Sequence, residues 1–186
     1  MKRPKVLVAV SGRHGAGKTT LAKAIADHFN LIYVSAGVLF REMAKKHGMS
    51  IVEFTRYAEK HPEIDRTIDE RMKQEASKGG RVLDAQLAYF FSKKFHPFNI
   101  LVFAEVKDIV KRVSEREGIS LKEARKEVRT REKNEKKRFK KLYGIELWNP
   151  TDFHIMINTS RITKEKAKKI AIDSISIFQG ELNFTP

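Results

Sequence analysis

The sequence contains no cysteine among its 186 residues, so it has neither a disulfide framework nor a thiol for catalysis. It also lacks an apolar run of membrane-spanning length and a recognisable signal peptide. Repeats, linkers and low-complexity tracts are missing, and the six histidines show no metal-ligand spacing. From these absences we expect a single cytoplasmic domain that has no membrane contact. We also expect a monomer, although none of these absences bears on the oligomeric state.

Acidic residues are few compared with basic ones. Lys and Arg number 38 against 23 Asp and Glu, which gives a formal net charge of +15. A surplus of this size suits a polyanion, either the phosphates of nucleotides or a nucleic acid, and it also suits a merely solvated surface. Charge alone therefore leaves the partner open; we expect small-molecule nucleotides, with a nucleic acid possible but not favoured.

One stretch near the start has the spacing of a phosphate-binding loop, G-x-x-x-x-G-K-[ST]. An apolar run at 6–10 precedes it, and an amphipathic helical pattern follows. Glycines let the backbone N–H groups approach phosphate oxygens, and the start of the next helix adds a partial positive charge. We expect the phosphates of a nucleotide to be held here by Gly12, Arg13, His14, Gly15, Ala16, Gly17, Lys18, Thr19 and Thr20, with Lys18 on the outer phosphates, Thr19 on Mg²⁺ and His14 mainly a spacer.

Strand-like and helix-like patterns alternate along the chain, which predicts an α/β fold with a parallel sheet covered on both faces. Five strands are expected, at 6–10, 31–34, 81–84, 99–104 and 153–158. Capping boxes at Ser50–Glu53 and Ser120–Glu123 open two of the helices. The region between the second and third strands is longer than an ordinary crossover and has room for a second substrate.

An acid, Asp84, ends the third predicted strand. Ligands of such sheets bind outside the carboxyl ends of the strands, so Asp84 could hold Mg²⁺ through water. Alternatively, it caps the short helix predicted at 87–91. The sequence does not separate these two interpretations.

The segment from 121 to 143 is helical and intensely charged. Arg131 and Arg138 lie seven residues apart and therefore face the same way on a helix, where they could close over a polyphosphate and neutralise charge. The alternative for the run as a whole is a solvated face with Glu–Lys pairs four residues apart.

Several stretches together resemble the archaeal cytidylate kinases. They are the loop, Ser35–Ala44, Tyr57–Arg66, Arg116–Ser120, Arg131–Phe139, Tyr143–Ile145 and Ile157–Ser160. The resemblance covers nearly the whole chain in matching order. It implies phosphoryl transfer from ATP to CMP or dCMP with Mg²⁺. It also implies one domain with a core (1–35, 80–116 and 150–186), a monophosphate-binding insertion (36–79) and a lid (117–149).

The resemblance also assigns residues. Arg41, with Ser35 and Gly37 in the same stretch, should hold the phosphate of the acceptor, because a guanidinium grips two oxygens at once. Arg131 and Arg138 match the lid arginines. Asp65 and Asp69 lie four apart, and either could accept a hydrogen bond from the cytosine amino group. Surface pairing with a neighbouring base is the alternative, and it is favoured for Asp69.

The sequence departs from the family's pattern after the third strand, where an acid followed by Gly-Arg-Leu becomes Asp84-Ala85-Gln86-Leu87. Gln86 can donate hydrogen bonds to the acceptor but carries no charge. Loss of a charge-assisted contact costs about 1.5–3 kcal/mol. Either a base such as Lys93 compensates, or the acceptor has changed, or CMP turnover is poor. Two other functions remain open: a phosphate-loop enzyme acting on RNA or in ribosome assembly, and an ATP-binding regulator.

Overall fold

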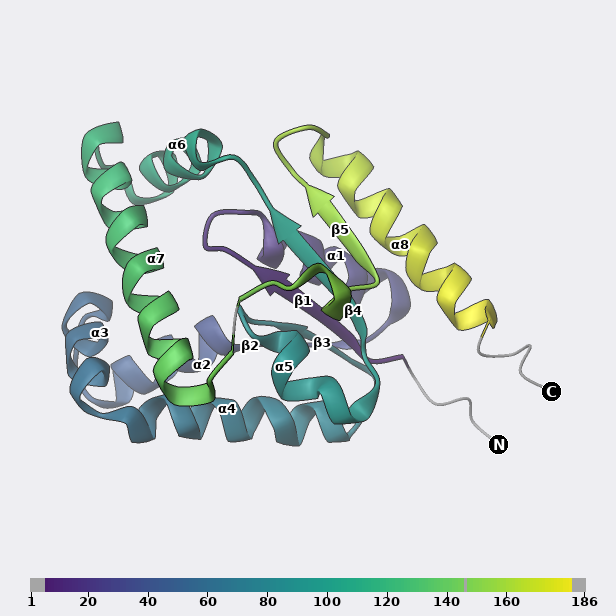
Figure 1. Ribbon diagram of the computed structural model, residues 1–186, viewed down its shortest axis with the longest axis horizontal. Helices are drawn as coiled ribbons and strands as arrows, with labels where there is room; N and C mark the ends of the chain where they lie inside the picture. Colours follow the sequence, from purple (N-terminus) through teal and green to yellow (C-terminus); the bar gives the residue numbers. More distant parts are fainter. Residues whose placement is uncertain (1–5, 146, 182–186) are drawn as a thin grey trace.

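The computed structural model describes residues 6–145 and 147–181, without the side chains at 52, 138 and 181. Its centre is an all-parallel sheet of five strands in the order β2-β3-β1-β4-β5 (Figure 1). The strands are β1 (Val8–Gly12), β2 (Ile32–Ser35), β3 (Arg81–Asp84), β4 (Phe98–Phe103) and β5 (Ile155–Asn158). The predicted fold class is confirmed, with strand ends displaced by one or two residues.

Helices connect every pair of successive strands, as parallel strands require. They are α1 (Lys18–Phe29), α2 (Ala36–Lys46), α3 (Ile51–Lys60), α4 (Pro62–Ser77), α5 (Ala88–Ser92), α6 (Val106–Glu117), α7 (Leu121–Tyr143) and α8 (Lys164–Glu181), with 3₁₀ turns at Lys93–Phe95 and Pro150–Asp152. Both predicted capping boxes form, at the starts of α3 and α7.

Two apolar cores cover the two faces of the sheet, because successive strand residues point to opposite sides. Val8 and Val10 of β1 face α1, α6 and α8, whereas Leu7 and Ala9 face the helices between β2 and β4. The three central strands are therefore buried on both sides, as their near-continuous apolar residues require, whereas the edge strands β2 and β5 are partly exposed.

The long helix α7 passes from one core to the other beyond the carboxyl ends of the strands (Figure 1). Ala124 and Val128 join the core beneath α6, and Phe139 and Tyr143 join the core beneath α4 and α5. Between these two apolar ends, α7 faces the phosphate loop with polar side chains. No helix within the described residues is long and apolar enough to cross a membrane.

Candidate functional site

The loop between β1 and α1 is shaped by glycines in backbone conformations that other residues rarely adopt. Gly12 and Gly17 have φ angles of 136° and 99°. A Cβ atom on Gly12 would lie 1.9 Å from the carbonyl oxygen of Val102 on β4. Gly12 is thus required by both its dihedral angle and the neighbouring strand.

Two residues from distant elements hold the loop in place. The Thr159 hydroxyl, after β5, donates to the carbonyl of Ala16 at 2.8 Å. The Arg112 guanidinium on α6 donates to the carbonyls of Gly15 and Thr159 and to the Thr159 hydroxyl. Sequence spacing gave no signal for Arg112, because its role depends on how α6 packs beside the loop.

Lys18 is buried at the start of α1, with 8% of its surface exposed. Its Nζ donates to the carbonyl of Arg13 at 2.8 Å, across the mouth of the loop. Burial lowers the pKa of Lys18, while the charges of Asp84 and Glu135 act in the opposite direction. A buried ammonium beside the loop amides is the arrangement that binding to phosphate oxygens calls for.

Asp84, at the end of β3, is buried directly behind the loop. Its Oδ2 accepts hydrogen bonds from the Thr19 hydroxyl at 2.7 Å and the Tyr33 hydroxyl at 2.8 Å. Burial raises the pKa of Tyr33, which keeps that hydroxyl a donor. The alternative role of Asp84 as a helix cap is wrong: α5 starts after Leu87 and has no side-chain cap.

The Thr19 hydroxyl and the Asp84 carboxylate form an oxygen pair that fits Mg²⁺. This ion is usually bound by one or two carboxylates together with water and substrate phosphates. Within the described residues no group of three or more His, Cys, Asp or Glu side chains forms a metal cage. A hydroxyl and one carboxylate therefore suit a metal that arrives with nucleotide.

A carboxylate from α7 reaches into the site. Glu135 accepts hydrogen bonds from His14 Nε2 and from Gln86 Nε2, each at 2.7 Å. Burial would raise the pKa of Glu135, but the bonds from His14 and Gln86 and the charge of Arg131 outweigh it and lower the pKa. One turn earlier, Glu132 lies 3.4 Å from Arg13. His14 therefore contacts α7 and is more than a spacer.

Of the two arginines predicted for the lid, the structure describes the side chain of Arg131 only. Arg131 lines a small crevice between the phosphate loop, α6 and α7 with His14, Val113 and Val128. Its guanidinium lies 3.5 Å from Glu127 and 4.0 Å from Glu135. The side chain of Arg138 lies outside the described residues. The predicted Glu–Lys pairs of a solvated face are absent from the described part of α7, where the ion pairs within the helix involve Arg131.

The remaining predicted residues lie at the end of β2 and on α2 and α4. Ser35 is buried at the end of β2, and Arg41 on α2 is exposed, with Nη1 3.8 Å from where a Cβ on Gly37 would lie. Asp65 is half-buried on α4. Asp69 is buried and accepts a hydrogen bond from Tyr143 of α7, so surface pairing of Asp69 is wrong.

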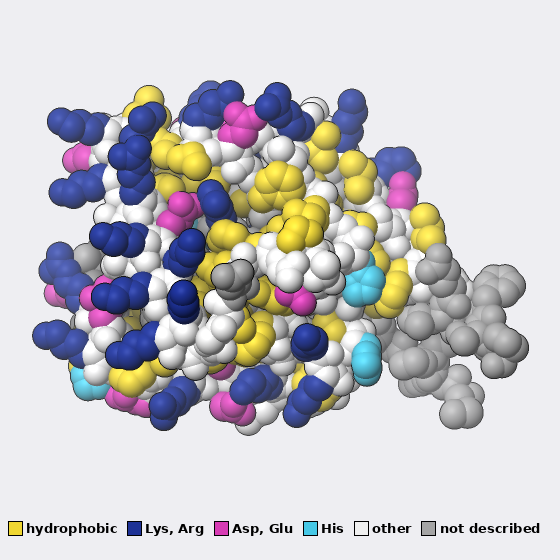
Figure 2. All heavy atoms as spheres, viewed as in Figure 1, with side chains coloured by type: hydrophobic (Ala, Val, Ile, Leu, Met, Phe, Trp, Pro, Cys, Tyr) yellow, Lys and Arg dark blue, Asp and Glu magenta, His cyan; other side chains and the backbone are white. Residues whose placement is uncertain are grey.

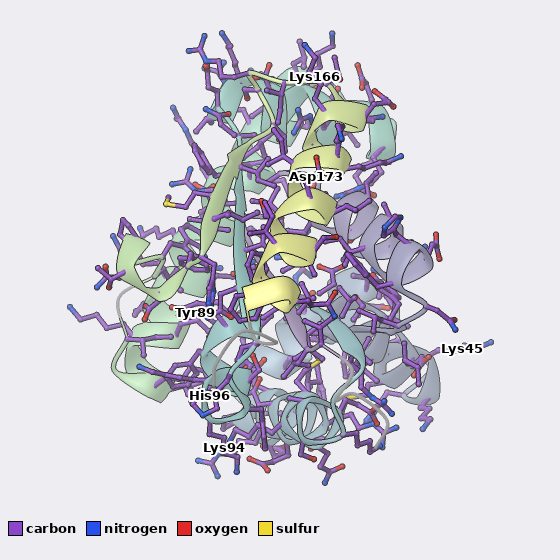
Figure 3. The ribbon with its side chains drawn as sticks, turned by 90° about the vertical axis from the view of Figure 1, so that its right-hand side faces the viewer. Lys45, Tyr89, Lys94, His96, Lys166 and Asp173 are labelled. Atoms are coloured by element: carbon purple, nitrogen blue, oxygen red, sulfur yellow. The ribbon has the colours of Figure 1, made fainter. Side chains whose placement is uncertain are left out.

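The structure does not support Lys93 as a substitute for the missing arginine. Lys93 is exposed and begins a 3₁₀ turn that leads to the amino end of β4. Lys94 and His96, next along the chain, lie at the lower end of the molecule in Figure 3. The charged neighbour that Gln86 does have is an acid, Glu135. Among the other loop residues, Ala16 is buried and Thr20 is exposed.

The loop, the parallel sheet and the helical cover together define a phosphate-loop kinase. Solved structures share this fold: an uncharacterised protein from Eubacterium ventriosum has a TM-score of 0.72 at 19% identity, covering 92% of this chain and 99% of that one. Shikimate kinase from Bacteroides thetaiotaomicron has a TM-score of 0.61 at 16% identity, covering 92% and 98%. At these identities the likeness concerns the fold alone.

The chain belongs to the cytidylate kinase-like family, whose pattern matches residues 7–161. It is 41% identical over 178 residues to the cytidylate kinase of Pyrococcus horikoshii, covering 94% of this chain and 92% of that protein. It is 42% identical over 170 residues to the cytidylate kinase of Pyrobaculum neutrophilum, covering 91% and 92%. The chain is thus a nucleoside monophosphate kinase by family, and these relatives do not favour either alternative function.

Proposed function

We propose that the protein transfers the terminal phosphoryl group of ATP to CMP or dCMP, with Mg²⁺. The observation that carries this is the buried Lys18 ammonium at the mouth of a glycine-shaped loop, in a chain of the cytidylate kinase-like family. Phosphoryl transfer needs positioning and charge neutralisation more than covalent chemistry. In this proposal the loop amides, the buried Lys18 ammonium and the lid position the phosphates and neutralise their charge.

In this mechanism the loop amides and Lys18 hold the outer phosphates of ATP. Thr19 and Asp84 would hold Mg²⁺, which would screen phosphate charge. Arg131, on the inner face of α7, neutralises charge that develops as the phosphoryl group moves. Arg138 belongs to this proposal by family resemblance only.

The acceptor would lie between α4, the end of β3 and the lid. Arg41 would grip its phosphate, with Ser35 and Gly37 allowing close approach, and Asp65 would accept from the cytosine amino group. The three-part division into core (1–35, 80–116 and 150–186), insertion (36–79) and lid (117–149) is part of this proposal.

Gln86 has a different role in this proposal from the arginine that it replaces. Its amide nitrogen is committed to the ionised Glu135, so its carbonyl oxygen turns the other way. That oxygen is buried and has no hydrogen-bond partner among the described residues. A buried acceptor of this kind suits a hydroxyl or amino donor of the acceptor nucleoside, whereas a phosphate oxygen would be repelled.

The direct test is a steady-state survey of CMP, dCMP, UMP and AMP with ATP and Mg²⁺. We expect the cytidine nucleotides to have the highest kcat/KM, and no turnover of any monophosphate would contradict the proposal. Gln86→Leu, which removes the acceptor oxygen together with the hydrogen bond to Glu135, should raise the KM for CMP about fivefold. The KM for ATP should change less than about twofold, and an equal change in both would count against the role of Gln86.

A further inference from the structure

The outward surface of α7 carries an uninterrupted stripe of basic side chains. At 100° per residue, the eight members fall within about 120° of the helix circumference. All are exposed: Lys122, Arg125, Lys126, Arg129, Lys133, Lys136, Lys137 and Lys140. Figure 2 shows Lys and Arg side chains gathered along the edge of the molecule where α7 lies in Figure 1.

Acidic residues of α7 lie elsewhere on the helix. Glu132 and Glu135 face the phosphate loop, Glu127 pairs with Arg131, and Glu123 closes the capping box with Ser120. No member of the stripe forms an ion pair with any side chain that the structure describes. The basic face is therefore not neutralised by its own helix, and its charge is available to a partner.

The like charges of the stripe repel one another and thereby destabilise α7. Basic residues stand four apart at Lys122 and Lys126, Arg125 and Arg129, Arg129 and Lys133, Lys133 and Lys137, and Lys136 and Lys140. Each like-charge pair at this spacing destabilises a helix by about 0.2–0.5 kcal/mol. A solvated helix would gain stability from glutamates among these positions, so their absence calls for an external counter-charge.

We infer that this stripe is a docking surface for the phosphate backbone of a nucleic acid. From Lys122 to Lys140 the stripe extends about 27 Å along one straight helix, which matches a linear polyanion. It contains no aromatic side chain to stack on bases, so binding should be independent of sequence. This inference does not rest on the proposed kinase reaction, because the stripe faces away from the phosphate loop.

An anionic membrane is a poorer match for the same surface. Helices that lie on membranes bury an apolar face beside their basic residues. On the described part of α7, Leu121 at the first turn is the one large apolar side chain that is exposed. The apolar residues Val128 and Phe139 are buried in the protein cores.

The test measures binding of a fluorescein-labelled, mixed-sequence RNA of twenty nucleotides by anisotropy at increasing KCl. The variant Lys133→Gln/Lys136→Gln/Lys137→Gln removes three charges from the stripe. Single-strand contacts contribute about 0.7 each to the slope of log K against log salt, so the slope should become shallower by about 2. At 0.1 M salt, affinity should fall about a hundredfold.

The matched control is Lys164→Gln/Lys166→Gln/Lys168→Gln on α8, which lies across the sheet from α7 in Figure 1. Lys166 lies on the first turns of α8, as Figure 3 shows. The control changes net charge equally, and we expect it to weaken RNA binding less than about threefold. Equal losses in the two variants would overturn the inference, because net charge rather than the stripe would then cause binding.

A second variant separates binding from stability. Lys133→Glu creates attractive pairs with Arg129 and Lys137, so Tm should not fall while RNA affinity decreases at least tenfold. Unchanged RNA affinity in this variant would contradict the proposal. So would binding of the parent to phosphatidylserine vesicles without any binding to RNA at 50 mM salt. CMP kinase activity of each variant is assayed separately, so failure of the kinase proposal leaves the binding result interpretable.

Discussion

The phosphate loop and helix α7 face one another but are held by different forces. The loop is fixed by backbone geometry: Gly12 fits only because it has no Cβ, and Arg112 and Thr159 bond its carbonyls. The central part of α7 is held by a few side-chain contacts, chiefly His14 and Gln86 with Glu135, and Arg13 with Glu132. From this difference we expect a rigid anion site beneath a helix whose central part can separate from it.

The largest expected effect lies at the centre of the loop. Lys18→Ala removes the buried ammonium, and we expect kcat to fall about a thousandfold, because a preorganised charge in a dry site contributes several kcal/mol to transition-state stabilisation. The measurement is steady-state turnover with ATP and CMP, together with ATP affinity by calorimetry. Unchanged affinity and activity would remove the basis of the proposed function.

Because the loop is rigid, we expect one added methyl group at Gly12 to reduce the stability of the protein strongly. Gly12→Ala should reduce the free energy of unfolding by about 3 kcal/mol or more, because Cβ would overlap the Val102 carbonyl at a φ of 136°. Gly48→Ala is the matched control: its φ is also positive, at 65°, but no atom lies within 4 Å of the new Cβ. It should cost about 1 kcal/mol. Equal losses in urea unfolding would show that the loop is not sterically fixed.

The lid should respond to a change of one atom in Glu135. Glu135→Gln replaces a carboxylate oxygen bonded by His14 or Gln86, and a hydrogen bond to a charged group contributes about 1.5–3 kcal/mol. We expect hydrogen exchange of amides 131–139 in the ligand-free protein to become about tenfold faster. Glu127→Gln, whose side chain is 40% exposed, should change it less than about twofold. Equal exchange rates in the two variants would contradict the idea that the hydrogen bonds of Glu135 hold α7 against the loop.

A smaller effect is expected from pH. The pKa of His14 in the closed lid is lowered by burial, against the opposing influence of Glu135, so the closed state prefers neutral His14. Closure should therefore weaken as pH falls below about 6.5, the ordinary pKa of histidine. The pKa of Glu135 is also lowered, so its contribution persists above its ordinary pKa and is lost at more acidic pH. Exchange rates of α7 amides between pH 8 and 5 measure the first step.

His14→Gln is the control for that pH series, since glutamine cannot titrate. We expect the change below pH 6.5 to disappear in this variant, while the more acidic change due to Glu135 remains. A pH profile identical to that of the parent would assign the first step to another group.

Some features of the site follow from the sequence and others do not. The spacing of Gly12, Gly17 and Lys18 predicts the loop, and the acid at the end of the third strand predicts Asp84 beside it, since parallel strands end at one edge. The spacing of residues along the sequence could not decide whether Asp84 caps a helix or belongs to the site. That choice depends on Thr19 and Tyr33, from α1 and β2, reaching the same oxygen.

The contacts of the lid were not predictable, and three expectations changed with them. His14 pairs with Glu135, Asp69 is buried beneath Tyr143, and Gln86 has an acidic neighbour in place of a basic one. These pairs join residues between 49 and 121 positions apart. Charge patterning along α7 identifies a helix with bases, but the angle at which that helix crosses the site selects which side chains reach inward.

By itself, the sequence determined the alternation of strands and helices, the two capping boxes and the phosphate loop, because these depend on near neighbours and on the conformational limits of glycine. The tertiary structure alone decided the partners of Glu135, the anchoring of the loop by Arg112 and which side chains of α7 face the loop, namely Arg131, Glu132 and Glu135, while the basic stripe faces outward. The physical reason is that such contacts require two elements to pack at a particular distance and rotation, and local propensity contains no information about either.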